Sequence, residues 1–325
     1  MRRRTILIVG GLLALPLLLA GVGSIYQTVA TTRDLVATPP PGELIDIGTQ
    51  RLHFWCMGSE TPAVVLESGL GGSAFGWAAV QRRVAEFSKV CSYDRAGFGY
   101  SDEGPAPRTS GRIAEELGSL LDSAHIEGPV ILVGASFGGF STRILASTQP
   151  DRVSGLVLVD ASHEEQQRRL AAAGLQPTVP AALGFVVRAA SFGILRLRNQ
   201  TLGANPDAVD PAVRQFVRAT VHRASRYRAL YSETMSWEQS AEQVRKTRRT
   251  MNIPVVVLTA GSWPQDSRQI HDELQRDQLL LSSRACQKIA EGVGHDIVGE
   301  APDLVIEAIR SVVERVRAKE GTPAC

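Results

Sequence analysis

The sequence lacks the signatures of several common protein classes. Its four cysteines are too few for a small disulfide-rich fold, and no cluster of cysteine and histidine has the spacing of a zinc site. It contains no phosphate-binding loop and no G-x-G-x-x-G at a first strand–helix turn. It has no internal repeat, and its 44% hydrophobic and 21% charged residues are ordinary for a globular protein. We therefore expect a globular chain that requires neither a metal ion nor a nucleotide cofactor.

The chain also has little net charge. Its 35 Lys and Arg residues nearly balance 33 Asp and Glu, for a formal charge of +2. Three of the positive charges, Arg2, Arg3 and Arg4, precede the first apolar run, so the rest of the chain is close to neutral. Electrostatic capture of nucleic acid is therefore not expected to be its main role.

One long apolar run lies near the N-terminus. Residues 6–26 contain no charge and, as a helix, would cross a hydrocarbon core of about 30 Å. The three arginines before the run predict a cytoplasmic N-terminus and an extracytoplasmic body. A secretory signal that is cleaved to release the protein is the alternative, although its apolar region is usually shorter, about 7–15 residues. We expect an anchor or signal at 1–27, a proline-rich linker at 28–42 and a folded body at 43–325.

The body alternates apolar strands with helical patterns. Two short strands are expected before residue 58, and continuous apolar strands are expected at 63–67, 89–93, 129–134, 153–159 and 253–259. Helical patterns separate them, which predicts a mostly parallel sheet covered by helices on both faces. No strong strand occurs over about 162–250, where apolar residues recur every three or four positions. This segment is expected to be a helical lid inserted into the sheet domain.

A nucleophile motif lies between the third of these apolar strands and the helix that follows it. The run Gly134-Ala135-Ser136-Phe137-Gly138 matches G-x-S-x-G in the strand–turn–helix context that the motif requires. Small neighbours leave room for a strained turn at Ser136, and the Phe137 N–H would point at a developing oxyanion. A serine needs a base within hydrogen-bond reach. His295 in Gly294-His295-Asp296, near the C-terminus, is the expected base, whereas His53, His125 and His222 are expected to have structural or solvated roles.

Two further motifs make the resemblance specific. Residues 67–72 (ESGLGG) resemble the oxyanion loop of α/β-hydrolases, usually His-Gly-x-Gly, and residues 93–101 (YDRAGFGYS) are similar to the D-x-R-G-x-G-x-S loop of that family. The resemblance covers residues 43–320. It implies a Ser–His–acid triad and backbone oxyanion donors at Leu70 and Phe137, with Asp94 and Arg95 holding a loop together. A serine nucleophile, rather than aspartate, argues against haloalkane dehalogenase and epoxide hydrolase chemistry.

The acidic member of the triad has two candidates. Asp160 ends the strand after the serine turn, at the sheet edge where catalytic side chains gather. Asp266 follows the later position that the family often uses, where the expected Gly-x-x-Asp turn reads Gly261-Ser262-Trp263-Pro264. We favour Asp160 as the triad acid and keep Asp266 as the alternative. If Asp160 has no catalytic role, we expect it to cap the next helix. His163 is expected either to line the pocket or touch the acid, or to lie at the lid entrance without a chemical role.

These residues predict a serine hydrolase that cleaves a carboxylic ester or related acyl compound through an acyl-enzyme. An acyltransferase or amidase would use the same triad, and a catalytically silent binding scaffold remains the alternative from another class. The expected partners are a small-molecule substrate and, through the N-terminal run, a membrane. The fold implied by the resemblance also places the strands of Cys56 and Cys91 side by side. In an extracytoplasmic body these cysteines form either a disulfide or buried free thiols.

Overall fold

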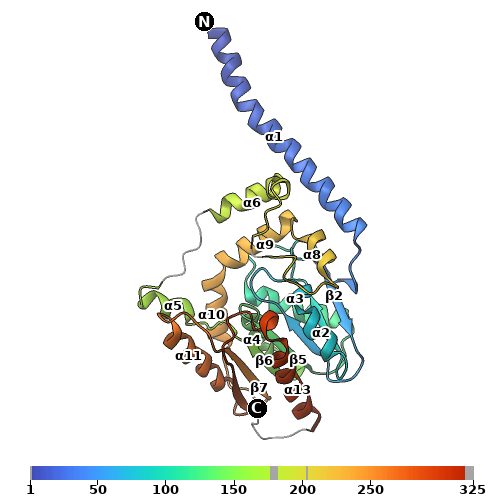
Figure 1. Cartoon of the computed structure of the whole chain (residues 1–325), viewed down its shortest axis with the longest axis vertical. Helices are drawn as coiled ribbons and strands as arrows, with labels where there is room; N and C mark the ends of the chain where they lie inside the picture. The colour runs from blue at the N-terminus through green and yellow to red at the C-terminus, as the bar shows by residue number, and fades with distance from the viewer. Residues whose placement is uncertain (1, 176–181, 203, 319–325) are drawn as a thin grey trace.

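The computed structural model describes residues 2–175, 182–202 and 204–318, with side chains from residue 15 onward. Its centre is an eight-stranded sheet with the order β1-β2-β4-β3-β5-β6-β7-β8 (Figure 1). Strand β2 runs antiparallel to both β1 and β4, and the other neighbours are parallel. The strands are β1 (Glu43–Asp46), β2 (Arg51–Met57), β3 (Val64–Glu67), β4 (Val90–Tyr93), β5 (Val130–Ala135), β6 (Val153–Val159), β7 (Val255–Ala260) and β8 (Ala285–Ala290). The mostly parallel sheet predicted from the sequence is confirmed.

Helices cover both faces of the sheet because its central strands are apolar on both sides. On one face, alternate strand residues such as Leu132 pack against α3 (Ser110–Ser123) and α4 (Gly138–Thr148). On the other face, residues such as Val133 pack against α2 (Ala78–Val84) and α13 (Pro302–Ala318). Two further helices follow β7 and β8, namely α11 (Arg268–Asp277) and α12 (Ile297–Glu300).

Strand β8 was not predicted from the sequence. It pairs in parallel with β7 at the edge of the sheet, and five of its six residues are partly or fully exposed. Its sequence, ACQKIA, therefore lacks the continuous apolar run that marks the buried strands. Edge strands need less apolar sequence because one side of the strand faces solvent.

Between β6 and β7, the described residues 160–175, 182–202 and 204–254 form an insertion outside the eight strands of the sheet. Its described helices are α5 (Gln166–Ala172), α6 (Leu183–Ser191), α7 (Ile194–Leu197), α8 (Arg214–Thr220), α9 (Ala224–Met235) and α10 (Trp237–Thr247). Helix α10 packs on α3 and α4, and α9 packs on α6. The insertion is thus helical and attached to the sheet domain on one side.

The N-terminal helix α1 spans Arg2–Ala37 and extends away from the body at its N-terminal end (Figure 1). Among the described side chains, its segment Leu15–Ala37 is long and apolar enough to cross a membrane, and only 11% of its most apolar window is buried. The expected linker boundary was wrong, because residues 28–37 continue the helix. No proline or glycine interrupts that stretch, and the helix ends just before Pro39-Pro40-Pro41, which cannot continue it.

The C-terminal half of α1 is held by the insertion and by the sheet domain. The Gln27 amide donates to the His222 carbonyl at 2.6 Å, and Arg196 pairs with Asp34. The tail that follows is also bound, because the Tyr100 hydroxyl donates to the Thr38 carbonyl at 2.6 Å. His53 and Asp94, a buried pair, lie beside this tail, and His53 Nε2 donates to the Pro41 carbonyl at 2.6 Å. The C-terminal part of the helix and its connection to the sheet are therefore fixed to the body.

Cys56 on β2 and Cys91 on β4 lie directly opposite each other and form a disulfide, with Cα atoms 4.0 Å apart. Of the two states left open by the sequence, the structure has the disulfide. The bond joins residues 35 positions apart in the chain.

Replacing both cysteines by serine (C56S/C91S) should lower the free energy of unfolding by about 3–4 kcal/mol, because a loop of this length regains its freedom in the unfolded chain. Denaturant unfolding of the full chain in detergent, against the unreduced parent, measures the change. Peptide mapping without reductant that recovers both residues as free thiols would contradict the pairing.

Candidate active site

Ser136 sits in a tight turn between β5 and α4. Its φ angle is +49°, a strained conformation for a residue with a side chain. The turn is possible only because its neighbours are glycines: a Cβ on Gly138 would lie 2.6 Å from the Ser68 carbonyl oxygen, and one on Gly139 would lie 2.5 Å from Ala161 Cβ. The sequence Gly134–Gly139 thus places the Ser136 hydroxyl at the carboxyl edge of the sheet, beside the loop that follows β3.

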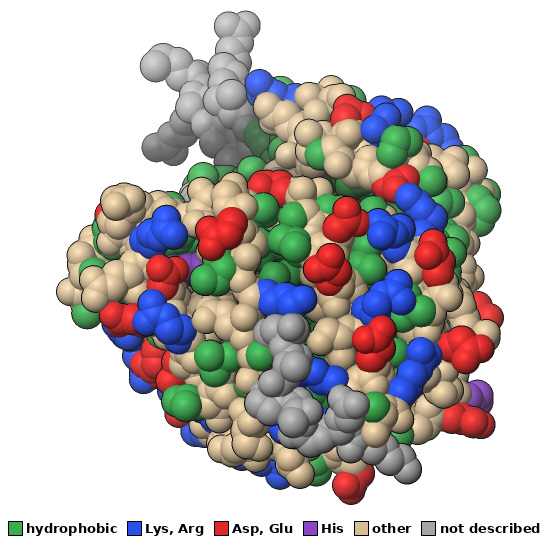
Figure 2. Space-filling view, turned by 60° about the horizontal axis from the view of Figure 1, so that its bottom comes forward, with side chains coloured by type: hydrophobic (Ala, Val, Ile, Leu, Met, Phe, Trp, Pro, Cys, Tyr) green, Lys and Arg blue, Asp and Glu red, His purple; other side chains and the backbone are tan. Residues whose placement is uncertain are grey.

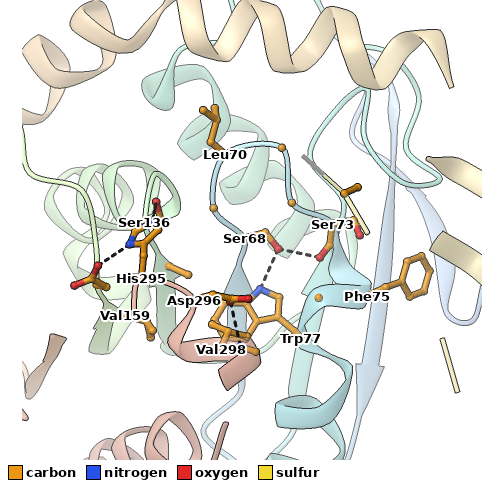
Figure 3. A pocket seen from close by; sticks show the side chains of 18 of the residues that line it. Ser68, Leu70, Ser73, Phe75, Trp77, Ser136, Val159, His295, Asp296 and Val298 are labelled. Carbon is orange, nitrogen blue, oxygen red and sulfur yellow. Dashed lines mark hydrogen bonds and ion pairs between the residues drawn. The ribbon is translucent and has the colours of Figure 1, made fainter. Parts of the chain in front are cut away.

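His295 reaches Ser136 from the loop between β8 and α12. Its Nε2 lies 2.9 Å from Ser136 Oγ, and its Nδ1 lies 2.6 Å from Asp160 Oδ2 (Figure 3). With Nδ1–H donating to the carboxylate, Nε2 is left to accept the serine proton. The structure therefore brings Ser136, His295 and Asp160 into one continuous hydrogen-bonded chain.

Asp160 directly follows β6 and is buried. Burial acts to raise the pKa of its carboxyl, but hydrogen bonds from His271 and His295 outweigh burial and hold the pKa below its usual value. The Ala260 N–H also donates to Asp160 Oδ1 at 3.0 Å. The carboxylate is therefore ionised and fixed in place. It does not cap the next helix, since α5 begins only at Gln166.

Asp266, the alternative acid, is exposed, and its carboxylate interacts with the Ser267 hydroxyl at 3.1 Å. It is not hydrogen-bonded to His295. His163 is also separate from the chain of hydrogen bonds: its Nε2 donates to Asp277 at 2.8 Å, and it does not line the cavity. Of the residues weighed in the sequence, the structure brings Asp160 to His295 and leaves Asp266 and His163 elsewhere.

His271 is a site residue that the sequence did not single out. It lies on α11, and its Nε2 donates to the second carboxylate oxygen of Asp160 at 2.8 Å. Burial acts to lower the pKa of His271, but Asp160 outweighs burial and raises it. Its ring stacks on Trp263, whose own edge faces His295. No local motif surrounds His271, so only the tertiary packing of α11 against β7, which brings the ring to Asp160, could have revealed it.

Residues 68–72, which the sequence predicts to be the oxyanion loop, lie beside Ser136, and Leu70 stands at the tip of this loop (Figure 3). Gly69 is close to the nucleophile, because a Cβ there would lie 3.2 Å from Ser136 Cβ. Within the described residues, neither the Leu70 N–H nor the Phe137 N–H donates a hydrogen bond to the protein. Both donors are thus free for a ligand oxygen.

A buried arginine supports this loop from below. Arg95 donates to the Ser68 carbonyl at 2.6 Å and to the Gly69 carbonyl at 2.9 Å. Glu67 and Glu233 pair with the same guanidinium at 2.7 Å each. Because two carbonyls of the loop accept hydrogen bonds from Arg95, a buried ionic network helps to set the conformation of the loop.

Ser68, which stands where the family usually has histidine, provides a second support. Its hydroxyl donates to the Ser73 carbonyl and accepts from Trp77 Nε1, each at 3.0 Å. Ser68 and Trp77 together tie the loop to the start of α2, so the loop is supported although the usual histidine is absent.

These elements border one cavity of about 900 Å³. Ser136, His295 and the oxyanion loop line one side, and residues of α8 and α9 from the insertion line another. Among the residues with described side chains, no group of three His, Cys, Asp or Glu residues is arranged to hold a metal ion.

Residues 64–308 match the family model described as the alpha/beta hydrolase family. The chain belongs to this family. An AB hydrolase superfamily protein of Gibberella zeae is 27% identical over 289 residues, which cover 79% of this chain and 87% of that protein.

Solved α/β-hydrolase structures show the same fold. The enol-lactonase from Burkholderia xenovorans LB400 matches 85% of this chain and 100% of its own, with 18% identity and a TM-score of 0.59. A thermophilic esterase from Thermogutta terrifontis matches 82% of this chain and 94% of its own, with 21% identity and a TM-score of 0.58. At this identity, the two structures establish the architecture, and the chemistry has to come from the residues themselves.

Proposed function

We propose that this α/β-hydrolase cleaves a carboxylic ester or a related acyl compound, with Ser136 as nucleophile, His295 as base and Asp160 as the triad acid. The observation that carries the proposal is the continuous chain of hydrogen bonds, 2.9 Å from Ser136 to His295 and 2.6 Å from His295 to Asp160, on the wall of a large cavity. A serine with an aligned base and acid is the arrangement that acyl transfer requires.

The proposed reaction has two halves. His295 Nε2 takes the Ser136 proton while Oγ attacks the carbonyl carbon, and the N–H groups of Leu70 and Phe137 stabilise the oxyanion. His295 then protonates the leaving alcohol, so that the C–O bond breaks and an acyl-enzyme remains. Water, deprotonated by His295, attacks the acyl carbon, and Ser136 leaves with the proton returned by His295. Transfer to an amine or alcohol, or cleavage of an amide, would differ only in the groups that enter and leave.

We also propose that the insertion acts as a lid, since residues of α8 and α9 line the same cavity as Ser136. Helix α1 is proposed to anchor the chain in a membrane with the body on the extracytoplasmic side. The three arginines at 2–4 and the apolar run support that orientation, and the Cys56–Cys91 disulfide agrees with an oxidising compartment. The contacts of Gln27 and Asp34 with the insertion favour retention of the helix over removal as a signal.

The full chain in detergent should react with a fluorophosphonate probe at Ser136 and hydrolyse short- and medium-chain nitrophenyl esters. The aligned base makes the hydroxyl nucleophilic, whereas an ordinary serine is inert to such probes. Peptide mapping of the labelled protein locates the adduct, and Ser136→Ala is the control. A folded chain that neither labels nor turns over any ester would instead support the binding scaffold.

A further inference from the structure

Arg226 is a charged residue in the cavity wall that the proposed mechanism does not use. It lies in the first turn of α9, is 4% exposed and lines the same cavity as Ser136. Within the described residues, neither of its terminal nitrogens, Nη1 and Nη2, has a hydrogen-bond partner. A buried guanidinium with both ends unpaired is rare in proteins, because it loses its hydration without compensation.

The neighbouring arginines are satisfied in ways that Arg226 is not. Arg223 donates to the backbone carbonyls of Gly99 and Ser101, and Arg228 forms an ion pair with Glu103. On the face shown in Figure 2, basic and acidic side chains likewise lie next to one another. The guanidinium carbon of Arg226 instead lies 5.2 Å from the Tyr227 ring centroid.

The charge on Arg226 is also unfavourable where it stands. Burial lowers the pKa of its guanidinium and outweighs the opposing effect of the Tyr227 side chain. No carboxylate among the described residues raises this pKa, and an arginine remains protonated at neutral pH. The first turn of a helix carries a partial positive charge, which favours anions and disfavours cations. Both effects would be relieved by an anion bound in the cavity.

The oxyanion loop connects Arg226 with the nucleophile. Gly69 lies against Ser136, and Gly71 lies against Leu230 with the guanidinium next to it: a Cβ on Gly71 would be 3.2 Å from Leu230 Cδ1 and 4.0 Å from Arg226 Nη2. Two residues of chain span at most about 7 Å. The guanidinium is therefore within reach of a substrate whose carbonyl is at Ser136 and whose chain runs past the loop toward α9.

We infer that Arg226 binds an anionic oxygen group, a carboxylate or a phosphate, on the substrate. The fork of Nη1 and Nη2 fits two oxygens of one such group. This inference rests on the proposed ester hydrolysis and makes it more specific, because the substrate class becomes esters that carry a negative charge several atoms from the scissile carbonyl.

Matched substrates test the inference in the full chain in detergent. The nitrophenyl ester of hexanoate is compared with the nitrophenyl half-ester of adipate, in which a carboxylate replaces the terminal methyl group, and with the ester of 5-phosphonopentanoate, in which a phosphonate replaces it. The parent should prefer an anionic ester over the neutral one in kcat/KM, and Arg226→Gln should reduce that ratio about 10- to 100-fold. The anionic ester with the higher kcat/KM shows whether the anionic group of the substrate is a carboxylate or a phosphate.

Arg228→Gln is the matched control, because it makes the same change two residues along α9 at an exposed, paired arginine. It should keep the preference of the parent. An equal preference in the parent and Arg226→Gln, or a parent that turns over the neutral ester at least as well, overturns the inference while leaving ester hydrolysis intact.

A binding measurement keeps the inference testable without turnover. The monoamide of adipate, which keeps one carboxylate, should raise the melting temperature of the parent more than neutral hexanamide does, and this difference should vanish in Arg226→Gln. If no ester is hydrolysed but the difference is present, the proposed reaction fails and the anion site stands. If the monoamide of adipate and hexanamide act equally on the parent, the anion site fails.

Discussion

Asp160→Asn should lower kcat about 10⁴-fold, the loss typical for the acid of a serine triad. Asp160 is a pure acceptor for His295 Nδ1, His271 Nε2 and the Ala260 N–H. Asparagine has the same shape as aspartate but only one acceptor oxygen. Its NH₂ group would therefore face one of the N–H groups that now donate to Asp160. If that clash turns His295 to the other tautomer, Nε2 carries a proton and can no longer accept the one from Ser136.

Asp266→Asn is the matched control for this experiment, since it makes the same change at the exposed carboxylate near the family's other acid position. It should leave kcat close to that of the parent. Steady-state hydrolysis of one nitrophenyl ester by both variants, with melting temperatures to confirm folding, decides between the two residues. A large loss in Asp266→Asn with an active Asp160→Asn would reverse the assignment.

Ser136→Ala should have the larger effect and lower kcat by about 10⁶-fold, because loss of a triad nucleophile removes the acyl-enzyme route entirely. Any remaining turnover would come from substrate binding and the oxyanion donors acting on water. The substitution should not disturb the fold, because alanine occupies the same backbone turn with one atom fewer.

Ser141→Ala provides the matched control for the nucleophile. This serine lies farther along α4, is buried, and bonds only the Gly138 carbonyl. Its variant should retain labelling and ester turnover. If Ser136→Ala keeps a substantial fraction of the parental activity, another group performs the attack and the proposed mechanism is wrong.

The sequence predicts well those parts of the fold that are determined by residues close together in the chain. The central strands are buried on both faces and so read as continuous apolar runs, and Ser136 lies in a turn whose glycines are required by contacts of a few ångströms. Strand β8 escaped prediction because an edge strand needs little apolar sequence. The end of α1 was placed too early because the apolar run stops at Tyr26, whereas the helix continues until the prolines.

The site residues that the sequence left open depend on contacts between distant segments. Asp160 and Asp266 both stand at plausible distances along the chain from His295, and only the placement of β6 beside β7 brings one of them to the histidine ring. His271 and Arg226 carry no motif at all. His271 is significant because it bonds the Asp160 carboxylate. Arg226 is significant because its buried terminal nitrogens have no hydrogen-bond partner among the described residues.

The connection between α1 and the body has a consequence for how the protein would meet its substrate. Polar contacts fix Gln27, Asp34, Thr38 and Pro41 to the insertion or the sheet domain, and α1 packs on α8, which lines the cavity. With α1 anchored in a bilayer, the cavity would stay at a constant height and tilt above the lipid surface. Diffusion would then carry the enzyme sideways as a rigid unit, and only compounds present in that thin layer of solution would be sampled.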